Sequence, residues 1–166
     1  MNLNLSQKER MLLEDQKSHE QLCIDKYTNY SNQSKDPQLK QMFLNHANQE
    51  RDHLNTINQM LSGEVQPVNK ENAQGQQNQE NQQNQQNNNN NPQGSNSTGL
   101  NNQNDTELCE DLLMTEKYVS GAYDTTIFEF KDTTARDVLN HIQKEEQEHG
   151  KSIYDYMAAH GMYKVQ

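Results

Sequence analysis

The chain has 166 residues, enough for one ordinary domain, and its formal net charge at pH 7 is −10. This acidity argues against nucleic acids and anionic membrane surfaces as partners. No stretch approaches the ~18 consecutive apolar residues of a membrane span, and the first residues lack the apolar segment of a signal peptide. We therefore expect neither a membrane span nor a signal peptide.

Residues 1–61 are expected to form a hairpin of two helices. The capping box Ser6-Gln7-Lys8-Glu9 predicts the start of the first helix. Apolar residues then recur at steps of three and four, which is typical of one helix face. Asp36-Pro37 provides an N-cap and a first helical residue for the second helix. Ser62-Gly63 predicts its end.

Residues 62–105 have a different composition, dominated by Asn and Gln without apolar periodicity. Such a segment cannot bury enough apolar surface to offset the entropy of ordering it. We predict a disordered linker, which is either a plain tether or an adhesive, prion-like tract that helps chains associate. A flexible linker of this length spans ~36 Å, about the length of one of these helices. It can therefore cross the bundle and place the third helix parallel to the second.

Residues 106–166 are expected to form a second helical hairpin. Asn104-Asp105-Thr106-Glu107 predicts the start of the third helix, and Asp132 predicts the cap of the fourth, which should end near Gly161. Gly150 lies inside the fourth helix, where Gly costs ~1 kcal/mol relative to Ala. It either allows a neighbouring group to approach closely or is a tolerated flaw.

The two hairpins are copies of each other. A shift of 96 positions superposes them without a gap. The superposed pairs include Glu20 with Glu116, Tyr27 with Tyr123, Glu50 with Glu146 and His53 with His149. Such a match predicts a duplicated hairpin. The predicted fold is therefore an all-α, ferritin-like four-helix bundle in which one long crossover joins the two hairpins.

Each half carries a Glu-x-x-His motif on the apolar face of its second helix. The motifs begin at Glu50 and Glu146. In each half the preceding helix carries a further glutamate on its apolar face, Glu20 in the first half and Glu116 in the second. Charged groups on a buried face cost free energy unless a partner compensates them. Di-iron and di-manganese bundles share this ligand set. One Glu comes from each of two helices, and one Glu-x-x-His motif comes from each of the other two.

The sequence thus predicts a dinuclear site with two divalent ions. Two such ions would neutralise the four carboxylates, and ligation by oxygen and imidazole suits iron or manganese. The alternatives are an inert hydrogen-bonded network that only fixes the helix register, or a site that has lost its metal. No residue is assigned a catalytic role. The predicted ligands are Glu20, Glu50, His53, Glu116, Glu146 and His149.

Three further side chains share these apolar faces. Tyr27 and Tyr123 lie seven residues beyond the upstream glutamates, where they either pack in the core or donate a hydrogen bond to a metal ligand. His46 lies one turn before Glu50, but Ile142 matches it in the second half. We therefore interpret His46 as a core histidine.

Several stretches of both helical pairs carry a family resemblance. They are Leu12-Leu13-Glu14-Asp15, Lys35-Asp36-Pro37-Gln38-Leu39, Met114-Thr115-Glu116-Lys117-Tyr118-Val119 and Tyr156-Met157-Ala158-Ala159-His160-Gly161-Met162-Tyr163. In these stretches the chain resembles the Coat F family of bacterial spore coat proteins. The resemblance implies a ferritin-like fold and a place in the spore coat, assembled during sporulation from the mother-cell cytoplasm. It implies other coat proteins or further copies of the chain as partners, and no established reaction.

Two functions of different classes follow. The first is a structural component of the spore coat that retains a dinuclear iron or manganese site. The alternative is a di-metal oxidoreductase similar to rubrerythrin, ferritin or manganese catalase, which would handle peroxide or iron. The sequence contains no cysteine-ligated electron-transfer module, which counts against a complete rubrerythrin.

Overall fold

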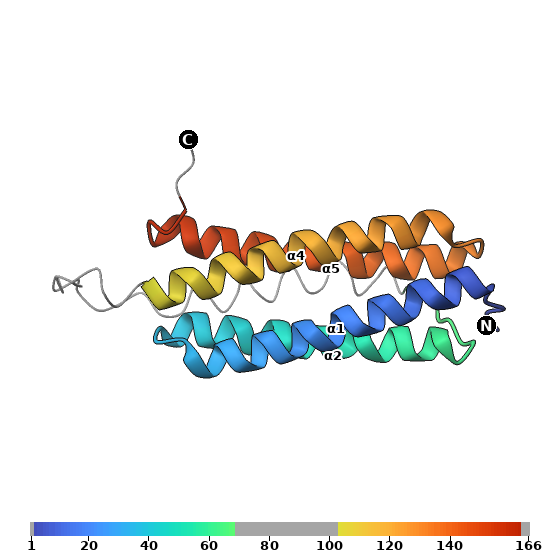
Figure 1. Cartoon of the computed structure of the whole chain (residues 1–166), viewed down its shortest axis with the longest axis horizontal. Helices are drawn as coiled ribbons and strands as arrows, with labels where there is room; N and C mark the ends of the chain where they lie inside the picture. The colour runs from blue at the N-terminus through green and yellow to red at the C-terminus, as the bar shows by residue number, and fades with distance from the viewer. Residues whose placement is uncertain (1, 69–102, 164–166) are drawn as a thin grey trace, which may run out of the picture.

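A computed structural model describes residues 2–68 and 103–163 as four α-helices (Figure 1). They are α1 (Gln7–Gln33), α2 (Pro37–Leu61), α4 (Gln103–Glu129) and α5 (Thr133–Ala159). α1 and α2 form one hairpin, and α4 and α5 form the other. The predicted all-α bundle of two helical hairpins is confirmed.

The helices begin where their local sequence predicts. The Glu9 backbone N–H donates to Ser6 Oγ at 3.2 Å, and the Ser6 N–H donates to the Glu9 carboxylate at 2.8 Å, which completes the capping box of α1. Asp36 caps α2 directly before Pro37 by accepting the backbone N–H two residues further on. Asp132 caps α5 by accepting the N–H three residues further on.

The chain leaves α2 through a turn that packs against the bundle. Gly63 has φ 90°, in the left-handed region that favours glycine, and its carbonyl accepts the Leu3 N–H at 2.7 Å. Val65, which follows this turn, is 2% exposed. The predicted linker spans residues 62–105, and of these the segment 69–102 lies outside the described residues. Both ends of the predicted linker are ordered, because residues 62–68 pack on the bundle and α4 begins at Gln103. The disorder of residues 69–102 stays a prediction.

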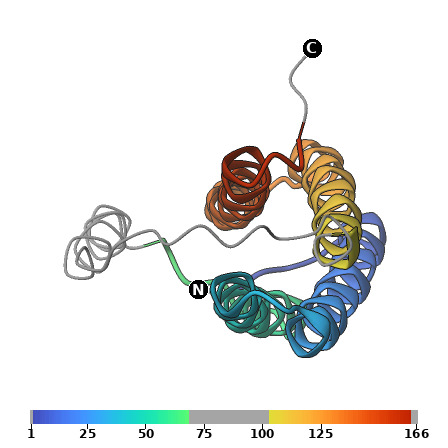
Figure 2. The same cartoon turned by 90° about the vertical axis from the view of Figure 1, so that its left-hand side faces the viewer.

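The two hairpins pack side by side, with α1 next to α4 and α2 next to α5 (Figure 2). Gln16 Nε2 donates to Thr126 Oγ1 at 2.8 Å, and Lys26 Nζ donates to Asp111 at 2.8 Å. An early residue of α1 thus meets a late residue of α4, so these helices are antiparallel. α2 and α4 consequently run in the same direction (Figure 1). This is the arrangement that the linker length allows.

Side chains from all four helices fill the interior of the bundle. The largest buried aromatic residues are Tyr27, Phe43, Tyr123 and Phe130, each at most 2% exposed. Among the described residues, none of the helices combines the length and the apolar character that crossing a lipid bilayer requires. The middle of this core is nevertheless strongly polar, and that polar region is the candidate site.

Candidate metal centre

Six charged side chains meet in the middle of the bundle, and every helix contributes at least one. All six are buried, with exposed fractions of 3% or less. They are Glu20 from α1, Glu50 and His53 from α2, Glu116 from α4, and Glu146 and His149 from α5. The structure therefore brings together all six residues that the sequence singles out.

These side chains form two overlapping clusters of four, and within each cluster the candidate ligand atoms lie within 4.8 Å of one another. We call them the His53 position and the His149 position. Glu50 and Glu146 belong to both clusters. The His53 position consists of Glu20, Glu50, His53 and Glu146, and the His149 position of Glu50, Glu116, Glu146 and His149.

The two shared carboxylates each turn one oxygen toward each histidine. His53 Nδ1 lies 3.3 Å from Glu50 Oε2 and 3.1 Å from Glu146 Oε1. His149 Nδ1 lies 3.1 Å from Glu50 Oε1 and 3.7 Å from Glu146 Oε2. Each of these two carboxylates thus presents one oxygen to each cluster.

The two remaining carboxylates each belong to one cluster, and each contacts a tyrosine from the other half of the chain. The Tyr27 hydroxyl donates to Glu116, and the Tyr123 hydroxyl donates to Glu20. Both tyrosines are completely buried. The sequence leaves open whether they pack in the core or bond to a cluster residue, and in the structure they do both.

The outer nitrogen of each histidine has an acceptor outside the clusters. His53 Nε2 lies 3.0 Å from Glu145 Oε2, and His149 Nε2 lies 2.9 Å from Gln49 Oε1. Each Nε2 therefore carries a proton and donates it, which leaves Nδ1 to face the cluster. This is the orientation of metal-binding imidazoles. Neither Glu145 nor Gln49 is among the predicted site residues, although each directly precedes the Glu of its motif.

The four cluster glutamates fall into two pairs, because burial raises the pKa of one pair and hydrogen bonds lower the pKa of the other. Burial raises the pKa of Glu20 and Glu116 well above the usual value. Burial also acts to raise the pKa of Glu50 and Glu146, but hydrogen bonds from both histidines outweigh it and lower the pKa of each. The shared carboxylates are thus the ionised pair.

The two histidines are protonated in the metal-free protein. Burial alone would lower the pKa of His149, but hydrogen bonds to Glu146 and Glu50 raise it to about 9. The pKa of His53 is raised in the same way, by hydrogen bonds to Glu145 and to the cluster carboxylates that outweigh its burial. In the absence of metal, protons balance the charge of the cluster.

The residues present fit divalent metal. Three buried carboxylate oxygens in the described part of the chain have no hydrogen-bond partner, namely Glu20 Oε2, Glu116 Oε2 and Glu146 Oε2. An unsatisfied buried acceptor costs ~1–3 kcal/mol, and a cation at either position would satisfy it. Carboxylate and imidazole donors suit iron or manganese. The clusters could therefore hold metal.

His46 covers one side of the His149 position. Its ring stacks on that of His149, with centroids 4.3 Å apart, and its Nε2 lies 2.9 Å from Ser152 Oγ. Burial lowers the pKa of His46 well below its usual value, so the ring is neutral. As a buried side chain outside both clusters, His46 fits its interpretation as a core histidine.

Gly150 follows His149 but is not required by its surroundings. A Cβ built on Gly150 would lie 3.6 Å from Glu116 Cβ and 3.7 Å from Leu113 Cδ1, which is ordinary van der Waals contact. An alanine would fit there. Of the two interpretations of this glycine, the structure favours a tolerated one.

Comparison with known proteins finds a family match for the second hairpin. Residues 104–166 match the Coat F domain, so the predicted resemblance is confirmed over that range. The chain is also similar to the uncharacterized protein YusN of Bacillus subtilis (strain 168), with 36% identity over 63 residues. That alignment covers 38% of this chain and 57% of YusN. The chain therefore spans little more than half the length of this relative.

Proposed function

We propose that this chain, whose residues 104–166 match the Coat F domain, is a structural component of the bacterial spore coat that binds two divalent metal ions. The observation that carries the metal site is the pair of buried carboxylates, Glu50 and Glu146, shared between two four-residue clusters. The coat assignment rests on the family match and on the resemblance that the sequence of both hairpins carries.

In this proposal each residue has a distinct role. Glu50 and Glu146 would help to hold both ions, while His53 and Glu20 would hold one of them and His149 and Glu116 the other. Iron or manganese bound there would supply Lewis-acid or redox chemistry. Two divalent ions carry the charge that neutralises the four carboxylates, so they replace the protons that balance the cluster in the metal-free protein.

A metal titration of the purified protein tests the site. We expect two ions of Fe(II) or Mn(II) per chain by elemental analysis, and a higher melting temperature, because an ion that binds only the native state stabilises it. A chain that binds no ion, and whose melting temperature does not respond to either metal, would leave only the inert polar network.

The coat assignment is tested in sporulating cells of the native host. A fluorescent fusion should collect around the forming spore, and the protein should be recovered from purified spores by coat extraction. The expected partners are other coat proteins or further copies of this chain, which are produced in the mother-cell cytoplasm. A fusion that stays evenly distributed in the mother cell after coat assembly would contradict the assignment.

One observation favours the oxidoreductase as a second candidate function. A cavity of about 350 Å³ between α2 and α5 is lined by His53, so a small molecule could approach the centre. The metal-loaded protein would then convert hydrogen peroxide to water and dioxygen, or oxidise Fe(II) with dioxygen. Steady-state turnover of either substrate, lost in Glu146→Gln, would support this function. A loaded protein without turnover would leave the structural role alone.

A further inference from the structure

We propose that the cavity between α2 and α5 is the entrance through which a divalent cation reaches the His53 position, and that the matching side of the His149 position is closed. The two positions would then take up metal at different rates. This inference rests on the dinuclear site proposed above, and it assigns a role to Glu145, a residue outside both clusters.

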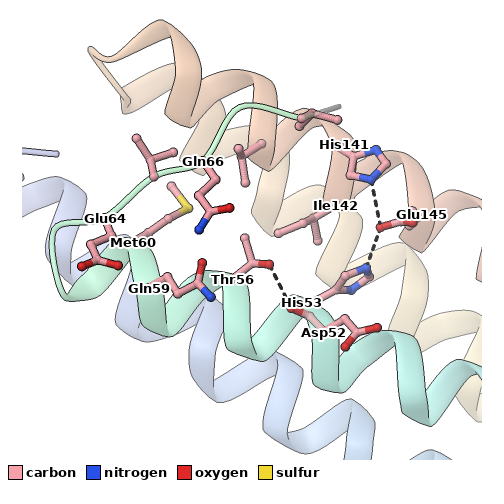
Figure 3. A pocket seen from close by; sticks show the side chains of 13 residues that line it. Asp52, His53, Thr56, Gln59, Met60, Glu64, Gln66, His141, Ile142 and Glu145 are labelled. Atoms are coloured by element: carbon pink, nitrogen blue, oxygen red, sulfur yellow. Dashed lines mark hydrogen bonds and ion pairs between the residues drawn. The ribbon is translucent and has the colours of Figure 1, made fainter. Parts of the chain in front are cut away.

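The cavity connects the protein surface to one edge of the site. It has a volume of about 350 Å³ and lies between α2, α5 and the segment that follows α2 (Figure 3). His53, the one cluster residue in its lining, has a side chain that is only 4% exposed. An ion in the cavity is therefore next to His53, whereas none of the His149-position residues lines the cavity.

The charge of the lining favours a cation. Three carboxylates line the cavity, those of Asp52, Glu64 and Glu145, and they outnumber the protonated His53 at its inner end. None of the described residues that line it is Lys or Arg. Part of the wall is apolar and includes Val138 and Ile142. Like charges set in a low-dielectric wall concentrate the field and raise the local concentration of counter-ions.

A chain of polar contacts leads inward from the rim to the site. His141 Nε2 lies 3.6 Å from Glu145 Oε2, and this same oxygen lies 3.0 Å from His53 Nε2 (Figure 3). The exposed fraction of the side chain falls along this path, from 37% at His141 to 17% at Glu145 and 4% at His53. Glu145 is thus the last carboxylate that an entering cation meets outside the site.

The repeat provides a comparison, because the matching residues around His149 differ. Gln49 stands in place of Glu145, so the side chain that contacts His149 Nε2 is uncharged. His46 stands in place of Ile142, and its ring lies flat against His149 while Ser152 bonds to its Nε2. Glu148 matches Asp52 and keeps its charge, but no carboxylate stands at the position of Glu145, and the ring of His46 covers His149 on this side.

The kinetics of Co(II) uptake by the full-length protein test the entrance, with the visible absorption of the bound ion as the signal. The unmodified protein should bind two ions per chain in two phases of equal amplitude. Glu145→Gln should slow the fast phase on the order of tenfold and leave the slow phase and the total of two ions unchanged. The amide still accepts the hydrogen bond from His53, as Gln49 does from His149.

Two further variants separate the entrance from a general charge effect. Val68→Trp, which fills the cavity from a half-buried position, should also slow the fast phase alone. Glu148→Gln removes a carboxylate from an exposed site on the same helix and should leave both phases unchanged.

The outcomes distinguish this inference from the proposed function. The entrance would be contradicted if both ions bound at one common rate, or if neither Glu145→Gln nor Val68→Trp changed the rate of either phase. Both results would leave the proposed dinuclear site unaffected. A protein that binds no Co(II), Fe(II) or Mn(II) would overturn the dinuclear site, and the entrance with it. Selective slowing of one phase by both cavity variants would establish the entrance.

Discussion

The four cluster glutamates look alike in the sequence, yet their surroundings give them different roles in the metal-free protein. Glu50 and Glu146 each face two protonated histidines, whereas Glu20 and Glu116 accept a hydrogen bond from a neutral tyrosine. Removing the charge of Glu50 or Glu146 leaves the protonated His53 and His149 with one carboxylate partner fewer. In the second pair the carboxyl groups, with their raised pKa, already favour the neutral form.

Glutamine substitutions should separate these two roles. We expect Glu50→Gln and Glu146→Gln to lower the free energy of unfolding of the metal-free protein by about 3 kcal/mol, because each breaks a buried ion pair. Glu20→Gln and Glu116→Gln should change it by less than about 1 kcal/mol. Urea unfolding of the four variants measures this difference. Equal losses in all four would show that the carboxyl groups share one protonation state.

The raised pKa of His149 makes the stability of the metal-free protein depend on pH. Its folded pKa is about 9, above the usual value of ~6.5 in an unfolded chain, so the native state binds the proton more tightly. The stabilisation is complete below about pH 6.5 and is lost as the pH rises through about 9, a change on the order of 3 kcal/mol. The pKa shift of His53 acts in the same direction.

Urea unfolding between pH 6 and pH 10, with a chelator present, should therefore show falling stability across this range. The metal-loaded protein should not follow this fall, because bound metal keeps both imidazoles neutral at Nδ1. A metal-free protein of constant stability across the same range would contradict the protonated histidines.

At the scale of the helix, the repeat offers a matched pair of N-caps. Asp132 caps α5 by accepting the Ala135 N–H at 2.9 Å. Asp36 caps α2 and also accepts the Tyr156 hydroxyl at 2.6 Å, which ties the start of α2 to the end of α5. The same residue type thus has a local role in one hairpin and an additional role between hairpins in the other.

Alanine substitutions should expose that difference. Asp132→Ala should destabilise the protein by about 1 kcal/mol through loss of the cap. Asp36→Ala should cost about 1 kcal/mol more, because the Tyr156 hydroxyl loses its acceptor. In a Tyr156→Phe background the two substitutions should cost the same. If Asp36→Ala remains the more damaging there, the hydrogen bond to Tyr156 is not the cause.

The helices were predictable from sequence because their signals act over a few residues. Capping boxes, proline at the first helical position and apolar steps of three and four all act within a turn or two, so α1, α2 and α5 begin at their predicted caps. The meeting of Glu20, Glu50, Glu116 and Glu146 was predictable because the repeat placed each on an apolar face.

The surroundings of the site were not predictable in the same way. Glu145 and Gln49 follow the local pattern of solvent-facing residues, and their contacts with the histidines depend on how closely α2 and α5 approach. The cavity depends on the same approach and on the turn at Gly63, which brings Val65 onto the bundle. These are distances between elements, and apolar spacing along one helix does not determine them.

At the scale of the whole molecule, the candidate site joins the two hairpins. The His53 position takes three residues from the first hairpin and Glu146 from the second, and the His149 position takes three from the second and Glu50 from the first. Bound ions should therefore hold the hairpins together in addition to the apolar core.

Cleavage between the hairpins would measure this contribution. A protease site can be introduced between residues 69 and 102 and then cut. We expect the two hairpins of the cut protein to remain associated at a lower protein concentration in Mn(II) than in chelator. A tenfold lower dissociation constant corresponds to about 1.4 kcal/mol, and analytical ultracentrifugation can resolve it. The Glu50→Gln, Glu146→Gln double variant should lose the effect of metal. If metal leaves the dissociation constant of the cut protein unchanged, the ions do not join the hairpins.

The reciprocal contacts have a consequence for symmetry. Tyr27 bonds to Glu116 while Tyr123 bonds to Glu20, and His53 faces Glu146 while His149 faces Glu50. Each contact is thus the image of another under exchange of the two halves, as in an isologous dimer. Two copies of one hairpin, related by a twofold axis between the shared carboxylates, would bring together the same six side chains. Joining the copies in one chain frees them to differ, so that one side of the site can open while the other stays closed.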